Sequence, residues 1–153
     1  MRPALAILIV VALASPAAAE PTPLKWPTHR QIADWTSTGL VVGAVAAESW
    51  RSWQADDRKG AFVNQGCRLG VTIAAAEITK RVVHRTRPDG SDRMSFYSEH
   101  TAIPASMSTG WRWQVAVPVV AGVGYLRMAA AKHYATDVLT GAAAGFLSHV
   151  VCR

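Results

Sequence analysis

The stretch from residue 60 to residue 88, GAFVNQGCRLGVTIAAAEITKRVVHRTRP, decides the fold class of this chain. Its apolar and small residues recur at helical spacing on one face, together with one lysine: Leu69, Ile73, Ala76, Lys80 and Val83. The pattern predicts a helix from about Gly60 to His84, because the residue before Pro88 disfavours helical geometry and stops it. A lysine on an apolar face is costly to bury unless it meets an anion or a counter-charge.

The remaining sequence also favours helices. No run of residues alternates between polar and apolar for long enough to indicate a strand, so we predict an all-α fold. The other expected helices cover about residues 32–53, a short stretch after His100, 113–131 and 135–151. The polar residues 54–57 predict a loop, and the sequence Pro-Asp-Gly-Ser-Asp at residues 88–92 predicts a turn-rich connection.

The composition of the chain excludes several classes of protein. Hydrophobic residues make up 50% and charged residues 17% of the 153 residues, which is too apolar for a disordered chain. Two cysteines are too few for a disulfide-rich scaffold or a cysteine-built zinc finger. The formal net charge of +6 favours acidic partners such as phosphate groups or anionic lipid headgroups.

The N-terminus has the three parts of a secretory signal peptide. A short cationic start, an apolar run at residues 4–13 and small residues at 17–19 predict cleavage after Ala19. From this signal we expect export to the periplasm or to the periplasmic face of a bacterial inner membrane. An uncleaved helix that anchors the chain in the membrane is the alternative. The chain divides into a signal peptide, an extended leader and one domain: residues 1–19, 20–31 and 32–153.

Export has a consequence for the two cysteines. In an oxidising compartment Cys67 and Cys152 can form a disulfide, and the alternative is that both are buried as unpaired thiols. The sequence leaves this choice open, because pairing depends on a Cα separation below about 7 Å.

The apolar segments after residue 20 favour a buried core or marginal membrane insertion over full spans. Polar residues interrupt every run before it reaches about 18 apolar residues, notably Asp34, Glu48, Glu77, Asp137 and His149. Gly141 and Gly145 have the spacing of a membrane helix-packing motif, but this spacing also lets soluble helices pack closely. Six tryptophans near expected helix ends fit either an interfacial belt or the edges of a core.

Three separated segments carry residues suited to binding and transferring phosphate. In the first, Lys80 and Arg87 are seven residues apart, which is two helical turns on one face. A lysine supplies a point charge and an arginine a planar fork of donors, so the pair can clamp anionic oxygens. A solvated basic helix end is the alternative interpretation.

The second segment contains Ser98, Glu99 and His100 at the expected start of a short helix. The hydroxyl of Ser98 and the backbone N–H groups there can bind a phosphate. His100 can donate a proton to a leaving group. A plain helix cap at Ser98 is the alternative.

The third segment contains Arg127, His133 and Asp137. His133 and Asp137 are four residues apart, a spacing that allows a hydrogen bond between them on a helix. An aspartate on one ring nitrogen leaves the other nitrogen free as a nucleophile or base. Arg127 adds a third cation. A helix-capping aspartate and a surface histidine are the alternative.

In order and spacing, these segments resemble the motifs of the type 2 phosphatidic acid phosphatase (PAP2) superfamily, which also contains vanadium haloperoxidases and bacterial class A acid phosphatases. The family pattern is K-x6-R-P, then P-S-G-H, then S-R-x5-H-x3-D. Lys80 and Arg87-Pro88 match the first part, and Ser98 and His100 match two of four positions in the second. The third part is matched by Arg127, His133 and Asp137. The resemblance covers about residues 32–150.

The resemblance implies a compact bundle of about five helices with the active site at converging helix ends. It implies that His133 attacks phosphorus, Asp137 orients His133, and His100 protonates the leaving oxygen. It also implies a phosphate-binding set in which Glu99 acts through its backbone N–H: Lys80, Arg87, Ser98, Glu99 and Arg127. The family's phosphatases need no metal ion, and we expect no cofactor. Three cations suit a transition state whose charge is spread over phosphoryl oxygens.

Three positions depart from the family pattern. Tyr97 replaces the proline, Leu126 the serine before the arginine, and Glu99 the glycine before His100. A carboxylate beside a phosphate is repelled by about 1–4 kcal/mol at roughly 4 Å, depending on the effective dielectric. Glu99 can instead point outward, pair with an arginine, or raise the pKa of His100. The alternatives are therefore an active phosphatase and a weakened relative that binds anions or lipid phosphates.

Other classes of function compete with this hypothesis. His100, His133 and Asp137 are a set that can hold zinc or iron, although the three neighbouring cations would repel a metal ion. A non-catalytic module on a membrane surface would also use the basic charge and the tryptophans, and a haloperoxidase would hold vanadate. Nucleic acid is not an expected partner of an exported chain. Among phosphate substrates we favour a lipid phosphate, because apolar helix faces lie near the expected site.

Overall fold

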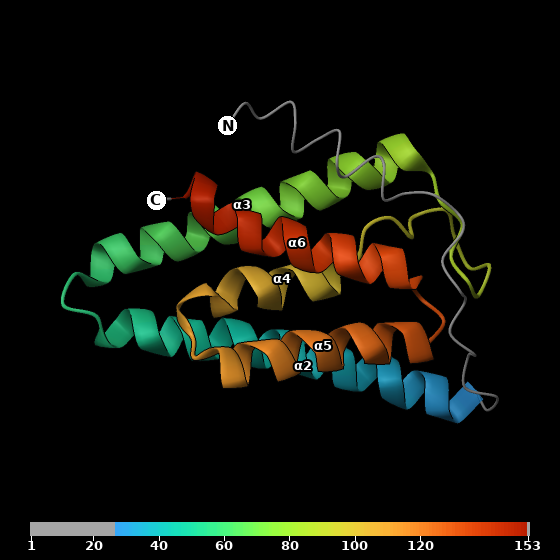
Figure 1. Ribbon diagram of the computed structural model, residues 1–153, viewed down its shortest axis with the longest axis horizontal. Coiled ribbons are helices and arrows are strands. Elements are labelled where there is room, and N and C mark those ends of the chain that lie inside the picture. The colour runs from blue at the N-terminus through green and yellow to red at the C-terminus, as the bar shows by residue number, and fades with distance from the viewer. Residues whose placement is uncertain (1–26, 153) are drawn as a thin grey trace.

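The computed structural model describes residues 27–152, which form helices joined by loops (Figure 1). In chain order, the elements are α2 (Pro27–Gln54), α3 (Arg58–Val83), α4 (Glu99–Met107), the 3₁₀ turn η1 (Ser108–Gly110), α5 (Trp113–Ala129) and α6 (Ala135–Val151). This part of the chain contains no strand, so the predicted all-α fold of about five helices is confirmed for it. The predicted signal peptide and the leader up to residue 26 lie outside the described residues.

Helix boundaries differ from the prediction mainly at the start of α2. The helix begins at Pro27 and not near Ile32, so the predicted extended leader is wrong for residues 27–31. Proline suits the first position of a helix, where a backbone N–H has no intrahelical partner to lose. α3 ends at Val83, one residue before the expected end, and the left-handed conformation of His84 (φ 49°) turns the chain into the loop before α4.

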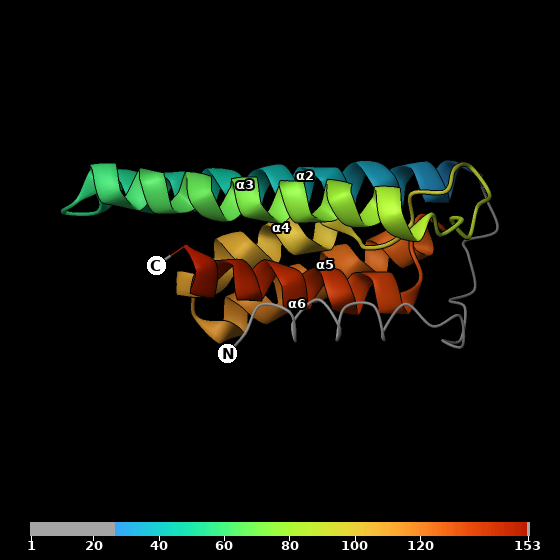
Figure 2. The same cartoon turned by 90° about the horizontal axis from the view of Figure 1, so that it is seen from above.

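α4 is the central element of the bundle. In Figure 2 the long helices α2 and α3 form one layer, α5 and α6 form the other, and α4 lies between them. Its side chains are accordingly buried, and Ala102, Ala105 and Met107 have no exposed surface. A helix of nine residues has little stability alone, so α4 depends on the four helices around it.

Close contact between α6 and α4 depends on two glycines. A Cβ atom added at Gly141 would collide with the backbone oxygen of Ser98, and one at Gly145 would collide with that of Ala102. The two glycines, four residues apart, therefore serve helix packing within this molecule. Their contact holds the start of α6 against the start of α4.

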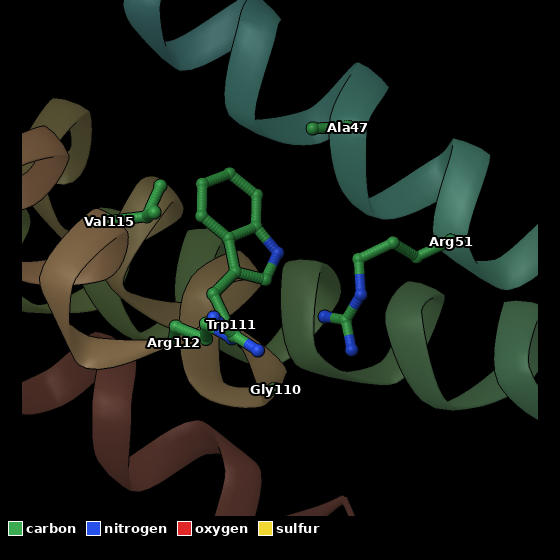
Figure 3. A pocket seen from close by; sticks show the side chains of 6 residues that line it. All are labelled: Ala47, Arg51, Gly110, Trp111, Arg112 and Val115. Carbon is green, nitrogen blue, oxygen red and sulfur yellow. The ribbon is translucent and has the colours of Figure 1, made fainter.

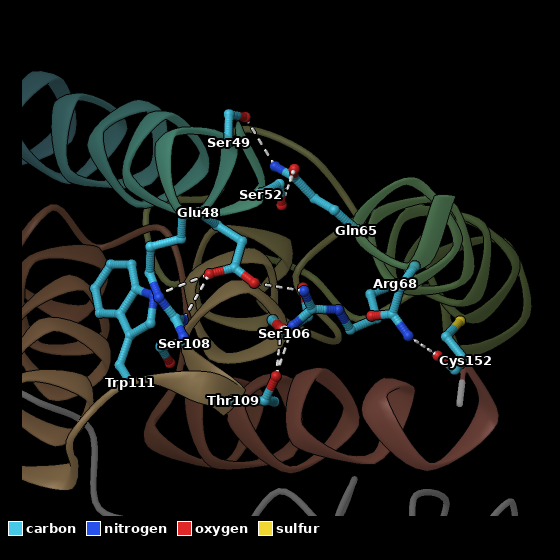
Figure 4. Close-up of polar contacts among 12 residues, drawn as sticks. Glu48, Ser49, Ser52, Gln65, Arg68, Ser106, Ser108, Thr109, Trp111 and Cys152 are labelled. Carbon is cyan, nitrogen blue, oxygen red and sulfur yellow. Dashed lines mark hydrogen bonds and ion pairs between the residues drawn. The ribbon is translucent and has the colours of Figure 1, made fainter. Parts of the chain in front are cut away.

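A buried polar network joins α2, α3 and the corner between α4 and α5 (Figure 4). Arg68 donates to Glu48 Oε1 at 2.6 Å and to the carbonyl oxygen of Ser106 at 2.8 Å. The second oxygen of Glu48 accepts from Trp111 at 3.1 Å and from Arg51 at 3.0 Å. The buried charges of Glu48 and Arg68 are thus paired and hydrogen-bonded, which explains these two residues as structural.

The two cysteines form a disulfide, which resolves the alternative that the sequence left open. Cys67 on α3 and Cys152 at the end of α6 have Cα atoms 5.8 Å apart. The bond joins positions separated by 85 residues. The carbonyl oxygen of Cys152 also accepts a hydrogen bond from the side chain of Asn64, so α3 holds the end of α6 through two contacts.

Candidate active site

The predicted site residues lie at one end of the bundle, on the right in Figure 1, where α3 and α5 end and α4 and α6 begin. Direct contacts join segments that are distant in sequence, such as Lys80 with Glu99 and His133 with Ser95. Other predicted residues lie near enough for their charges to lower the pKa of His133: Arg127, Arg87 and His100.

His133 is buried, with 2% of its surface exposed, and one hydrogen bond holds its ring. Nδ1 lies 2.7 Å from the carbonyl oxygen of Ser95. Because a carbonyl oxygen only accepts, Nδ1 carries the hydrogen, and Nε2 of the neutral ring keeps its lone pair. Burial, and then the charges of Arg127 and Arg87, lower the pKa of His133 well below 6.5. The imidazole is therefore neutral at pH 7, in the tautomer that a nucleophile needs.

Asp137 does not orient His133 directly, which corrects the role expected from the four-residue spacing. Nδ1 of His133 and Oδ2 of Asp137 are 3.9 Å apart, too far for a hydrogen bond. The reason is that α6 begins at Ala135, so His133 precedes the helix and lacks helical geometry. Ser95 connects the two residues instead. Its hydroxyl donates to Asp137 Oδ2 at 2.5 Å, and its carbonyl accepts from His133.

Arg85, which the sequence analysis did not select, is the counter-charge of Asp137. It donates to Asp137 Oδ1 and to the hydroxyl of Thr136, both at 2.7 Å. Its guanidinium also lies over the ring of Tyr134, 4.2 Å from the ring centre. Burial raises the pKa of Asp137, while hydrogen bonds from Ser95, the Tyr134 N–H and Arg85 oppose that rise. The sequence signal that could have identified Arg85 was its position between Lys80 and Arg87 in the first basic segment.

Two of the predicted phosphate-binding cations lie beside acidic residues. Lys80 Nζ is 2.5 Å from Glu99 Oε2 and 3.1 Å from Glu77 Oε1. Arg87 Nε donates to Asp92 Oδ1 at 2.7 Å. Glu99 and Glu77 therefore balance the charge of Lys80, and Asp92 balances that of Arg87.

Arg127 faces polar residues of α2 that the sequence analysis also missed. It pairs with Asp34, and its Nη1 lies 3.4 Å from Ser37 Oγ. Thr38 Oγ1 lies 3.4 Å from His100 Nε2. Asp34, Ser37 and Thr38 lie within one helical turn of one another on α2, and this polar cluster was the signal that could have found them.

His100 lies in the first turn of α4 and is neutral in the free protein near pH 7. Burial, followed by the charge of Arg127, lowers its pKa to about 4, although the charges of Glu99 and Asp34 act in the opposite direction. A histidine of this kind is protonated in acid solution, or when a bound anion raises its pKa. Low pH and a bound phosphate thus both favour an acid role for His100.

Ser98 occupies the cap position before α4 and is fully buried. Its N–H donates to the carbonyl oxygen of Asp137 at 3.0 Å, and its hydroxyl accepts from Thr101 at 3.0 Å. The backbone of Ser98 therefore docks the start of α6 onto α4. The predicted contact of this residue with phosphate would come from its hydroxyl.

The described residues do not assemble a metal centre. Between residues 27 and 152, no group of three or more His, Cys, Asp or Glu side chains lies close enough together to hold a metal ion. In the metal-site hypothesis, His100, His133 and Asp137 were the ligands. In the structure, Nδ1 of His133 and both oxygens of Asp137 are engaged in hydrogen bonds instead.

A pocket opens at the other end of the bundle (Figure 3). It is lined by Ala47, Arg51, Gly110, Trp111, Arg112 and Val115. Arg51 and Trp111 already donate to Glu48, and none of the predicted site residues reaches this pocket. It therefore does not compete with the histidine site as the place of chemistry.

Comparison of the chain with protein-family models, with curated proteins and with solved structures found no match. The resemblance to the PAP2 superfamily therefore rests on the sequence motifs alone. The function has to be inferred from the chemistry of the site itself.

Proposed function

We propose that the protein is a metal-independent phosphatase that hydrolyses a phosphomonoester or diphosphate through a phosphohistidine intermediate. The observation that carries this proposal is the state of His133, which is buried, neutral and held through Nδ1 so that Nε2 keeps its lone pair. Arg87 and Arg127 place positive charge near this ring. A neutral nucleophile beside cations suits attack on a phosphorus atom whose oxygens are negatively charged.

In the first step, Nε2 of His133 attacks phosphorus and forms an N–P bond while the bond from phosphorus to the leaving oxygen breaks. His100 donates a proton to that oxygen, and the product alcohol or phosphate leaves. The phosphoryl oxygens are held by the residues of the predicted binding set, Lys80, Arg87, Arg127, Ser98 and the backbone N–H of Glu99.

In the second step, water attacks the phosphohistidine and gives a proton to His100, which is now neutral. The N–P bond breaks, and inorganic phosphate leaves. The hydrogen bond from Nδ1 of His133 to the carbonyl of Ser95 is kept throughout. It stabilises the positive charge that the ring acquires when it carries the phosphoryl group.

A weakened, anion-binding relative is the second candidate. The pairing of Lys80 with Glu99 favours this candidate, because the carboxylate already neutralises a lysine that the phosphate would need. Such a protein would bind phosphate groups or lipid phosphates without hydrolysing them. A turnover assay separates the two candidates.

The surface favours a lipid phosphate as substrate, at the periplasmic face of the membrane. Four tryptophans are exposed on the helices: Trp35, Trp50, Trp53 and Trp113. Tryptophan is enriched where proteins meet the membrane interface, so we propose that this protein associates with a membrane surface. Within residues 27–152, no helix combines the length and the hydropathy needed to cross a bilayer.

Phosphate release by the purified mature chain tests the proposed activity. The assay contains EDTA and compares one soluble aryl phosphate with one lipid phosphate in detergent micelles. We expect turnover that resists EDTA and falls at least about a thousandfold in His133→Ala, because the nucleophile is lost. His149→Ala is the matched control, since it removes a histidine near the far end of α6, and it should retain the wild-type rate.

Three outcomes would contradict the proposal. Turnover that survives in His133→Ala would reject the phosphohistidine step, and turnover lost in EDTA would point to a metal-dependent reaction. A folded wild-type protein that binds phosphate but hydrolyses neither substrate would favour the anion-binding candidate.

A further inference from the structure

We propose that Glu99 is an internal competitor for the phosphate site. Its carboxylate occupies Lys80 in the free protein and is displaced when a phosphate group binds. The inference rests on the proposed function only in taking Lys80 as a phosphate-binding residue. It gives the side chain of Glu99 a role that the motif, in which this residue contributes a backbone N–H, does not contain.

The contact between Glu99 and Lys80 has the geometry of a ligand contact. Glu99 Oε2 lies 2.5 Å from Lys80 Nζ, across 19 residues of sequence. The side chain of Lys80 is only 10% exposed, so few positions around its ammonium remain for another anion. Glu99 is the first residue of α4 and stands between Ser98 and His100. Its carboxylate therefore reaches the lysine from the part of the site that the phosphate would enter.

Glu77 contacts the same ammonium and provides an internal comparison. It lies one turn before Lys80 on α3, with its Oε1 3.1 Å from Nζ. The Glu77 side chain is 44% exposed, against 24% for Glu99, so solvent screens its charge more strongly. Glu77 pairs within its own helix, whereas Glu99 joins two helices. Both contact Lys80, but only Glu99 is also adjacent in sequence to Ser98 and His100, which would touch the substrate.

Because Glu99 pairs with Lys80 in the free protein, the apparent affinity of the site for phosphate is lowered. The apparent Kd equals the intrinsic Kd divided by the fraction of molecules in which Lys80 is free of Glu99. A phosphate group with up to two negative charges can replace a single carboxylate. The reverse exchange, in which Glu99 returns to Lys80, helps to expel the product phosphate. The carboxylate thus weakens phosphate binding without blocking the site.

Binding of inorganic phosphate tests this inference. Isothermal titration calorimetry at constant ionic strength would compare the mature wild-type chain with Glu99→Gln and with Glu77→Gln. Glu99→Gln keeps the size of the side chain but removes its charge, and we expect the apparent Kd to fall at least about fivefold. Glu77→Gln should change it by less than about twofold, because that carboxylate is more exposed. Glu99→Gly is a second variant in which no side chain can contact Lys80, and it should match Glu99→Gln.

The results distinguish this inference from the proposed activity. Unchanged or weaker binding in both Glu99 variants would overturn the internal competitor, and so would equal gains in Glu77→Gln and Glu99→Gln. Absence of phosphate binding in every variant would overturn it as well. Tighter binding by Glu99→Gln in a protein without turnover would keep the competitor and reject the phosphatase. Turnover that depends on His133, with an unchanged Kd in the Glu99 variants, would support the phosphatase and reject the internal competitor.

Discussion

At the scale of single residues, the chemistry of the site depends on which nitrogen of His133 carries the hydrogen. Ser95 decides this through its carbonyl oxygen, which accepts from Nδ1 and leaves Nε2 with its lone pair. The hydroxyl of the same serine is bonded to the buried carboxylate of Asp137, which anchors the segment that carries the carbonyl. In the proposed mechanism, Ser95 is therefore a positioning residue that acts on the substrate only through His133.

Ser95→Ala should lower kcat about tenfold to a hundredfold with little change in KM, because the carbonyl loses its link to Asp137. Nitrogen NMR shifts of His133 in the same variant should show a smaller population with hydrogen on Nδ1. Ser148→Ala is the matched control, since it removes a buried hydroxyl that bonds to Gly145 at the far end of α6. Equal kcat values in the two variants would show that the link to Asp137 has no effect on His133.

The pH dependence of kcat/KM should report on His100. Its pKa is lowered from 6.5 to about 4, so the protonated form that donates to the leaving group disappears as the pH rises above about 4. The value of kcat/KM, which reflects the free enzyme, should then fall about tenfold per pH unit. His133 stays neutral at pH 6.5 and above, because its pKa is well below that value.

Rate profiles on a soluble aryl phosphate would check this prediction, with circular dichroism confirming the fold at each pH. His100→Gln should be slow and should lack the alkaline decline. A decline centred near pH 6.5 in the wild type would contradict the lowered pKa of His100.

At the scale of elements, the site depends on how closely α6 approaches α4. Gly141 faces the backbone of Ser98, and the N–H of Ser98 donates to the carbonyl oxygen of Asp137. These contacts hold the first turn of α6, which carries Asp137, against the first turn of α4, which carries His100. Gly39 on α2 differs from Gly141, because a Cβ atom added there would meet no other part of the described structure within 4 Å.

The two glycines should respond in opposite directions to the same substitution. Gly141→Ala should lower the free energy of unfolding by about 1–3 kcal/mol, because the added Cβ collides with backbone that cannot move without shifting α4. Gly39→Ala should raise it by about 0.5–1 kcal/mol, because alanine favours the helix and meets open space. Urea unfolding followed by circular dichroism measures both. A stable Gly141→Ala protein with full activity would refute the importance of this contact.

At the scale of the whole molecule, the disulfide and the candidate site lie at different ends of the same helices. Cys67 is 16 residues before the end of α3 at Val83, which corresponds to about 24 Å along the helix. Cys152 follows the last turn of α6, whereas Asp137 lies in the first turn. The covalent link therefore restrains the bundle without touching the residues that carry the proposed chemistry.

Removing the disulfide should affect stability and leave the chemistry unchanged. Cys67→Ser with Cys152→Ser should lower the free energy of unfolding by up to about 4–5 kcal/mol, because the bond closes a loop across 85 residues. Thermal unfolding with and without a reducing agent measures this, and the reducing agent should have no effect on the double variant. A lower kcat in reduced protein that is still folded would contradict the separation of the two ends.

Sequence reasoning worked best where the signal is local. The expected helix over residues 60–84 compares with Arg58–Val83 in the structure, and the expected helix over 135–151 is reproduced as Ala135–Val151. Periodicity and helix-stop signals act over a few residues, so they survive without knowledge of the fold. Asp137 shows the limit of this approach. Its four-residue spacing from His133 allowed a direct hydrogen bond on a helix, but the helix starts between the two residues.

The sequence by itself determined the helices and the presence of three cations, two histidines and a carboxylate near their ends. Only the tertiary structure decided the partners of these residues. Arg127 meets Asp34 across 93 residues, and Ser95 meets Asp137 across 42. Such pairs form only within a few ångströms, so they depend on how α4 packs between the two layers and on the glycines that let α6 approach it. No spacing along the chain encodes that packing, and it selects Ser95 to orient His133 and Glu99 to occupy Lys80.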